Sequence, residues 1–546
     1  MDWRLPFIVF LFLFIFFLLK QLHLPHLAAK RPKPPLPPVA SPLPFLSLFC
    51  NHGFSLSKLE LLLRRFHSFL GPILTLRLLP FAPPVIFISG ASAAHDALIQ
   101  QGDAFAGRPP AVEPFIFLTA GSRDISFADY GPLWRLLRGN LFRVLHPSRL
   151  HLFAPARRCA LLFLLRKLQS QSPDGSGIIL PKESFRRALF NLHISMCFGE
   201  KLKEREIREI ESLQLFLLSL FTTFNVFAVL PAVAKLLYHK RWKKIVDARK
   251  RQAAIFLSLI KRRRKHEDYH RKGVNYCYVD SLLDLRLPEE EGRWLLINEA
   301  VNLCHEFLSG VETTTTVLEW TMAELAKHQE VQRKLLKEIK SIVAGDEDLL
   351  EEEQLKKMSY LKAVVLEALR RHPPSHFLLP HSVRDDVVLN GYLIPRGTEV
   401  RFSVANMNWD EKIWEDPMDF RPERFMAGGE GEGVDVTGKK EIKMMTFGAG
   451  KRMCPGQGLA MLHVEFMVAN LVREFEWKEA EGEKVDLSEK LEFTIVMKNP
   501  LRVLISPRKR NSDEEEEEEE EDEEKRKKKK EILSSGEQMR VRVPLG

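Results

Sequence analysis

The chain has 546 residues, of which 45% are hydrophobic, so it is long and apolar enough to bury a large enzyme core. The formal net charge is +9, but 14 acidic and 8 basic residues give the segment 511–546 a net charge of −6, which leaves +15 on residues 1–510. A basic body favours an anionic membrane surface or an acidic protein partner. Nucleic acid is not expected as the partner, because the sequence has neither zinc-finger spacing nor an aromatic RNA-binding signature.

Residues 1–30 are predicted to form a membrane anchor and its flank. Leu5 to Leu19 is an uncharged apolar run, and as a helix it would rise about 22 Å. The start of the chain lacks a positive segment and a spaced small-residue cleavage site, which favours an anchor over a cleaved signal peptide. Positive charges follow the run, so we expect a single span in the endoplasmic reticulum membrane with the body facing the cytosol.

Three further segments follow the anchor. Residues 31–40 are predicted to be a proline-rich hinge, because closely spaced prolines favour a stiff extended chain. Residues 41–510 are predicted to form one catalytic domain, and they contain no internal repeat. Residues 511–546 are predicted to be a disordered charged tail, because long blocks of like charge cannot bury a core.

Helical periodicity dominates the body. It predicts helices over residues 57–70, 131–145, 203–224, 241–264, 295–324, 329–344 and 360–371. Short strands are predicted at residues 73–78, 85–89, 387–389 and 399–403, and Asn390-Gly391 is typical of a hairpin turn. The predicted fold class is mainly α with minor β.

The most informative motif is F-x-x-G-x-R-x-C-x-G, which begins at Phe447 and contains Cys454. A cysteine thiolate bound to haem iron favours cleavage of the O–O bond, but it needs cover and hydrogen-bond donors. The glycines allow a tight turn, Phe447 is expected to shield the sulfur, and Arg452 to pair with a haem propionate. Pro455 is expected at the first position of a helix that runs to about Phe475.

With this motif the chain resembles the cytochrome P450 family, and the resemblance extends over residues 31–508. Two stretches, 367–374 and 443–450, are similar to plant microsomal enzymes near families 77 and 89. The resemblance implies the cytochrome P450 fold, a haem b cofactor and Cys454 as the axial ligand of its iron. The charged tail departs from the family pattern.

Two more motifs carry the resemblance. Glu367-Ala-Leu-Arg370 matches the family's E-x-x-R, and the later Pro422-Glu-Arg-Phe425 implies that Arg424 locks onto the pair Glu367 and Arg370. E-x-x-R alone says little, because it also occurs elsewhere in the chain. These three residues are expected to be structural.

Ser309-Gly-Val-Glu-Thr-Thr314 is similar to the family's oxygen-binding motif, with Ser309 where alanine or glycine is usual. Threonine hydroxyls that bond to main-chain carbonyls are expected to open the helix locally. The resemblance implies that Glu312 and Thr313 relay protons during oxygen activation.

Further matches concern the haem propionates. Trp134 and Arg138 match the family's W-x-x-x-R, and His381 and Arg108 are implied as additional propionate contacts. Together with Phe447, Arg452 and Cys454 they form the expected cofactor site.

The expected reaction inserts one oxygen atom from O2 into a lipophilic small molecule. Electrons are expected from NADPH through a membrane-bound cytochrome P450 reductase, with Lys439, Lys440, Lys443 and Lys451 as candidates for docking it. Two alternatives stay open: an isomerase or dehydratase of the same fold, and a non-catalytic haem-binding membrane protein. Pocket residues are expected from segments 105–127, 215–227 and 377–379, and the substrate itself is not predicted.

Overall fold

The computed structural model describes residues 34–45, 56–77, 83–172, 177–222, 225–228, 231–265, 276–343 and 349–508. The predicted anchor at residues 1–30 and the predicted tail at residues 511–546 lie outside these ranges. Within the described ranges, no helix combines the length and the hydropathy needed to cross a membrane.

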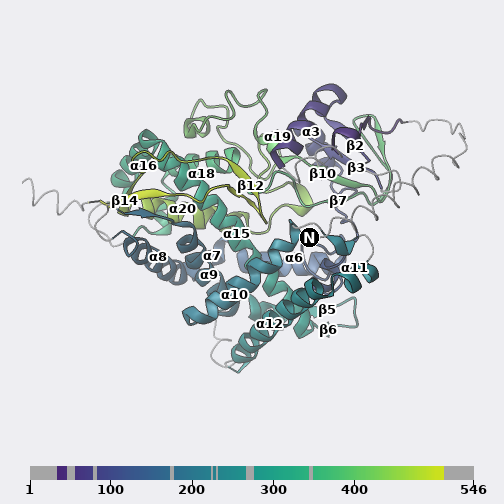
Figure 1. Cartoon of the computed structure of the whole chain (residues 1–546), viewed down its shortest axis with the longest axis horizontal. Coiled ribbons are helices and arrows are strands. Elements are labelled where there is room, and N and C mark those ends of the chain that lie inside the picture. Colours follow the sequence, from purple (N-terminus) through teal and green to yellow (C-terminus); the bar gives the residue numbers. More distant parts are fainter. Residues whose placement is uncertain are drawn as a thin grey trace, which may run out of the picture.

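One long helix, α15 (Ile297–Lys327), runs through the middle of the molecule (Figure 1). Other helices from distant parts of the sequence contact it: α9 (Lys182–Phe198), α12 (His239–Arg264), α18 (Ser359–Arg371) and α20 (Gln457–Glu474). Most side chains of α15 are buried, so this helix is the frame on which the site is built.

The other described helices of seven or more residues lie around α15 and its neighbours. They are α3 (Leu56–Leu70), α6 (Pro132–Leu145), α8 (Ala154–Gln169), α10 (Glu204–Leu218), α11 (Pro231–Leu237) and α16 (Gln329–Ile342). Short helical segments connect them, among them α4 (Ala91–His95), α5 (Phe115–Leu118), α7 (Pro147–Leu150), α14 (Tyr278–Leu283), α17 (Glu352–Leu355), α19 (Val404–Asn408), η3 (Ser219–Phe221), η5 (Pro422–Phe425) and η6 (Gly450–Arg452).

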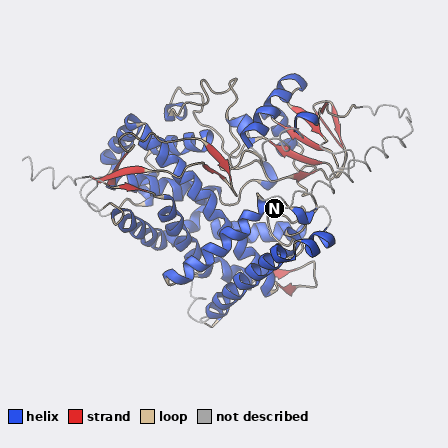
Figure 2. Ribbon diagram, viewed as in Figure 1, coloured by secondary structure: helices blue, strands red, loops and turns tan. Residues whose placement is uncertain are grey.

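The strands form small groups among the helices, and the largest sheet lies at the upper right of the view (Figure 2). The largest sheet has the order β1 (Val39–Ala40), β2 (Ile73–Leu76), β3 (Val85–Ile88), β10 (Glu399–Phe402) and β7 (His381–Ser382). A second sheet joins β11 (Phe475–Lys478), β14 (Val503–Pro507) and β4 (Ile178–Ile179). Two-stranded pairs are β5 (Arg286–Leu287) with β6 (Arg293–Trp294), β8 (Val387–Leu389) with β9 (Tyr392–Ile394), and β12 (Glu489–Leu491) with β13 (Ile495–Met497). The predicted class, mainly α with minor β, is confirmed.

Local sequence signals account for several element boundaries. Asn390 and Gly391 have φ angles of 48° and 82°, and they form the predicted turn between β8 and β9. α10 ends at Leu218, earlier than predicted, and the chain continues as η3. α20 begins at Gln457 and not at Pro455, because the Pro455-Gly456 pair forms a turn after the cysteine.

Candidate functional site

Cys454 lies in a tight turn between η6 and α20. Its main-chain N–H donates to the carbonyl oxygen of Phe447 at 2.8 Å, which closes the turn. Gly448 and Gly450 have φ angles of 71° and 68°, in the left-handed region that glycine adopts without strain. A Cβ atom at Gly450 would also overlap the carbonyl oxygen of Leu98, so two constraints require glycine there. The turn therefore holds the thiol in a fixed position before α20.

The surroundings of the Cys454 thiol act on its ionisation in opposite directions. Burial raises the pKa of the thiol, whereas the main-chain N–H of Gly456 and the guanidinium of Arg138 lower it. Arg138 itself donates to the carbonyl oxygen of Met453 at 2.5 Å, which ties α6 to the cysteine turn. A positive ligand at the sulfur would replace the stabilisation that burial removes from the thiolate.

Two more arginines meet beside this turn. Arg452 donates to the carbonyl oxygens of Ala106 and Ala128 at 2.8 Å each, and its guanidinium lies 4.6 Å from the ring centroid of Trp134. Arg108 donates to the carbonyl oxygens of Ser126, Leu379 and Pro380 at 2.8, 3.1 and 2.7 Å. Burial lowers the pKa of Arg452 to about 10, and burial together with Arg452 lowers the pKa of Arg108 to about 9.

His381 and Trp134 complete this group. The Nδ1 atom of His381 lies 2.7 Å from the carbonyl oxygen of Phe105, and burial together with Arg108 lowers the pKa of the imidazole to about 3. Trp134 Nε1 donates to the carbonyl oxygen of Ile125 at 3.0 Å. His381 is therefore neutral at pH 7, and the positive charge of the group comes from its three arginines.

The chemistry of this donor set fits a haem b. The hydrogen bonds described for the three guanidinium groups go to main-chain carbonyls, and burial lowers the pKa of each arginine. Buried guanidiniums of this kind gain most from carboxylate partners, and haem b carries two propionates. The group lies beside a thiol in a glycine turn, the ligand expected for haem iron.

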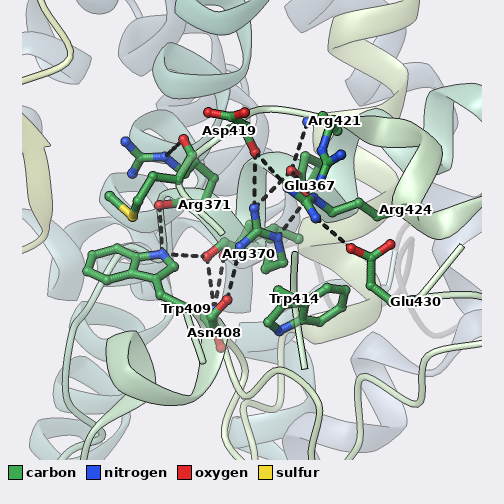
Figure 3. Close-up of polar contacts among 12 residues, drawn as sticks. Glu367, Arg370, Arg371, Asn408, Trp409, Trp414, Asp419, Arg421, Arg424 and Glu430 are labelled. Atoms are coloured by element: carbon green, nitrogen blue, oxygen red, sulfur yellow. Dashed lines mark hydrogen bonds and ion pairs between the residues drawn. The ribbon is translucent and has the colours of Figure 1, made fainter. Parts of the chain in front are cut away.

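Glu367 and Arg370 form a buried ion pair on α18 (Figure 3). Nε and Nη2 of Arg370 lie 2.7 and 2.9 Å from the two carboxylate oxygens of Glu367, and neither side chain is exposed. Arg424 from η5 adds a third member, with its Nε atom 3.2 Å from Glu367 Oε1. Sequence motifs far apart in the chain therefore meet in one network.

The network reaches the cysteine turn through Asn408. Arg370 donates to the carbonyl oxygen of Asn408 at 3.0 Å. The Asn408 side chain accepts from the main-chain N–H of Met445 at 2.9 Å and donates to Thr446 at 2.8 Å. Phe447 and the motif follow directly, so the buried ion pairs fix the position at which the motif begins.

The Ser309–Thr314 motif lies in the middle of α15. The Thr313 hydroxyl donates to the carbonyl oxygen of Gly310 at 2.9 Å, and the Thr314 hydroxyl donates to the same oxygen at 3.0 Å. The expected bonds from threonine to the main chain are present, but α15 continues as an α-helix through the motif. The prediction of a local opening is wrong for this structure, because the hydroxyls bind within the helix without displacing a turn.

Glu312 points away from this arrangement, towards α9. Its Oε1 atom lies 2.9 Å from Nε of Arg186, and both side chains are largely buried. Burial raises the pKa of Glu312, and Arg186 and Lys182 counteract the rise. The sequence does not single out Arg186, because the E-x-x-R spacing of Glu183 and Arg186 occurs at several places in the chain. No signal in one sequence links a residue of α9 to α15.

Comparisons with known proteins agree on the family. Residues 37–505 match the family model described as Cytochrome P450. The chain is 43% identical over 517 residues to "Cytochrome P450 89A9" of Arabidopsis thaliana, which covers 93% of this chain and 98% of that protein. It is 29% identical to a flavonoid 3'-monooxygenase of Crocosmia x crocosmiiflora, over 92% of this chain and 99% of that protein.

Two solved structures share the fold. A zebra fish cytochrome P450 with progesterone has a TM-score of 0.69 at 24% identity, over 82% of this chain and 99% of that chain. A retinoic acid-bound cyanobacterial cytochrome P450 has the same TM-score and identity, over 87% of this chain and 99% of that chain. At this identity the likeness concerns the fold. With the family match and the plant relatives, it makes the chain a member of the cytochrome P450 family, a haem-thiolate monooxygenase that resembles plant family 89.

Proposed function

We propose that the protein inserts one oxygen atom from O2 into a lipophilic small molecule, with electrons supplied by NADPH through a cytochrome P450 reductase. The observation that carries the proposal is the glycine-built cysteine turn beside three buried guanidinium groups. When bound there, haem b supplies oxygen activation under the electron donation of a thiolate ligand. The residues of the chain would hold the haem, orient the substrate and deliver protons.

In this proposal the sulfur of Cys454 would bind the haem iron, and Phe447 would cover the sulfur. Arg108, Arg138, Arg452 and His381 would hold the propionates. Trp134 packs against the guanidiniums of Arg138 and Arg452. Arg138 acts twice, because it also holds the carbonyl of Met453 next to the ligand.

Glu312 and Thr313 are the proposed proton carriers. The Glu312 side chain first moves away from Arg186, and its carboxylate then takes up a proton at Oε1 or Oε2. The Thr313 hydroxyl passes a proton on towards the reacting oxygen. The carboxyl is buried and its pKa is raised, which brings it closer to neutral pH than a carboxyl in water.

The proposal includes a membrane-bound protein with its catalytic domain in the cytosol. The apolar run in residues 1–30 and the basic flank after it support the anchor, and residues 31–40 would set the distance from the membrane. Lys439, Lys440 and Lys451 are exposed near the cysteine turn, and they are candidates for contact with an acidic reductase surface. Lys451 also lies 3.6 Å from the exposed carboxylate of Asp103. Lys443 is less available, because its Nζ donates to the carbonyl oxygen of Glu430 at 3.1 Å.

The test is turnover of lipophilic candidate substrates by the holoenzyme with reductase and NADPH. Product is expected only when NADPH, reductase and O2 are all present. Product formed without NADPH would overturn the proposal in favour of an isomerase or dehydratase. Haem binding without any oxygen-dependent turnover, across a broad panel of lipophilic compounds, would instead favour the non-catalytic alternative.

A further inference from the structure

Glu306 is an acidic side chain in the middle of the central helix. Residues 306, 310 and 313 are spaced four and three apart, so they lie on one face of α15. All three are partly exposed, whereas residues 301–304, 311 and 312 of the same helix are buried. Glu306 therefore shares the face that carries Thr313, two turns before it.

The carboxylate of Glu306 faces the segment 123–128. It accepts from the main-chain N–H of Ile125 at 2.9 Å and from the Ser126 hydroxyl at 2.5 Å. The main-chain carbonyls of the same two residues accept hydrogen bonds from the proposed propionate contacts. Trp134 donates to the carbonyl oxygen of Ile125, and Arg108 donates to that of Ser126. One short segment thus separates Glu306 from the proposed propionate contacts.

Four phenylalanine rings form a cluster that includes Phe127, the residue after the Ser126 that donates to Glu306. The ring centroids of Phe115 and Phe221 are 4.4 Å apart, and each lies 6.0 Å from that of Phe127. Phe493 joins them at 5.5 Å from Phe221. All four residues are at least partly exposed, so part of their apolar surface remains available to a ligand.

The electrostatics of Glu306 favour a positively charged neighbour. Burial raises its pKa, and Arg108 is one of the groups that offset the rise. When the haem propionates also interact with Arg108, the positive charge of Arg108 would stabilise the Glu306 carboxylate less. A cation near the carboxylate restores that compensation, and aromatic faces attract cations as well.

We propose that Glu306 and the four rings, Phe115, Phe127, Phe221 and Phe493, select lipophilic substrates that carry a positively charged nitrogen. The carboxylate takes the charge and the rings take the hydrocarbon body. This inference rests on the proposed monooxygenase function, for which it names the substrate class.

The experiment uses the full-length holoenzyme and three probes of one chain length: dodecyltrimethylammonium, dodecan-1-ol and dodecanoate. The quaternary cation has no lone pair and cannot ligate iron, so its binding reports the pocket alone. Dissociation constants are measured by equilibrium dialysis. The wild type is expected to bind the cation at least about tenfold more tightly than the alcohol, and dodecanoate least tightly.

The key variant is Glu306→Gln, which keeps an oxygen that accepts from Ser126 and Ile125 but removes the charge. It is expected to bring the cation-to-alcohol ratio close to one and to improve dodecanoate binding. The matched control is Glu319→Gln, thirteen residues later on α15, where the carboxylate pairs with Lys182 of α9 at 3.0 Å. The control is expected to keep the wild-type ratio.

Two results overturn the inference: a wild-type enzyme without preference for the cation, or a Glu306→Gln variant with an unchanged ratio. The first needs no variant, so misfolding of Glu306→Gln leaves the test intact. The reduced, CO-bound spectrum and NADPH-dependent turnover are recorded on the same samples. If both are normal while the charge preference is absent, this inference fails and the proposed function stands.

Discussion

Arg186 and Glu312 form an ion pair that joins α9 to α15 across 126 positions of sequence, with 2.9 Å between Nε and Oε1. The pair connects the proposed proton carrier to a helix that takes no other part in the proposed site. Burial raises the pKa of Glu312 and Arg186 lowers it, so the arginine sets how readily the carboxyl exchanges protons. Arg186 is thus a positioning residue whose effect is visible in a pH profile.

Replacing Arg186 with glutamine is expected to raise the pKa of Glu312, because an attraction that favours the ionised form is lost. The ionised form is then lost at a higher pH, so the acidic limb of the kcat–pH profile moves to higher pH. The measurement is kcat against pH with saturating reductase. Glu312→Gln is expected to lower kcat on the order of 100-fold.

Arg187→Gln is the matched control for this shift. Arg187 pairs with Glu211 at 3.1 Å and Glu204 at 3.3 Å, and not with α15. An identical displacement of the profile in both arginine variants would show that Arg186 acts through general stability and not through Glu312.

The buried Glu367 network is predicted to be needed for a folded cysteine turn. Arg424→Ala leaves the negative charge of Glu367 with one guanidinium partner fewer in a fully buried position, at a cost of about 3–5 kcal/mol. The expected result is a strong loss of haem incorporation, measured as the yield of the reduced, CO-bound band per unit of purified protein. The partly exposed E-x-x-R pair Glu290 and Arg293, at 2.6 Å, supplies the control. Glu290→Gln is expected to cost less than about 1 kcal/mol, and equal losses in the two variants would refute the prediction.

Buried histidines are predicted to make the protein sensitive to acid. Burial lowers the pKa of His193 and His372 to about 4 and that of His305 to about 3, and it lowers the pKa of His463 well below 6.5. A histidine with a depressed folded-state pKa contributes stability that is fully present above pH 6.5 and is lost as pH falls towards the folded value. Unfolding by denaturant should therefore become easier below pH 6.5.

His463→Leu tests this with one residue. Among the residues that the structure describes, neither ring nitrogen of His463 has a hydrogen-bond partner, and the side chain is fully buried. The variant should be at least as stable as the wild type at pH 7.5. Between pH 6 and 5 its free energy of unfolding should fall by about 1.4 kcal/mol less per pH unit. A pH dependence equal to that of the wild type would disprove the assignment.

The exposed lysines near the cysteine turn are predicted to dock the reductase. Lys439→Glu with Lys451→Glu is expected to raise the KM for reductase several-fold and to weaken the salt dependence of turnover, while substrate binding stays unchanged. Lys240→Glu with Lys243→Glu, on the exposed face of α12, is the control for net charge. The same rise in KM for both pairs would point to long-range charge and not to a docking surface.

The sequence predicted the elements whose apolar residues follow a clear period, among them α15, α16 and α18. It missed α8 and α9, because α9 is buried on most of its faces and so lacks a polar stripe that would reveal its period. It also placed Pro455 inside α20, since a proline at a helix start and a proline in a turn look alike in sequence.

For the candidate site too, the sequence predicts local motifs but not contacts between distant residues. The cysteine turn is local, so its glycines and Cys454 can be read directly from the sequence. Contacts across the fold cannot: Arg186 on Glu312 and Ser126 on Glu306 join residues more than 100 positions apart. Neither Arg186 nor Ser126 belongs to a motif that points to the site, and the packing of α9 and of the segment 123–128 against α15 brings each of them to its partner.

The reduced, CO-bound absorption spectrum of wild-type and Cys454→Ala protein, each prepared with haem, tests the central claim most directly. A thiolate ligand gives the red-shifted Soret band of the family, and the wild type is expected to show it. Cys454→Ala is expected to lose that band entirely, with Cys159→Ala, a change at an exposed free cysteine, retaining it. A Cys454→Ala spectrum identical to that of the wild type would contradict the account.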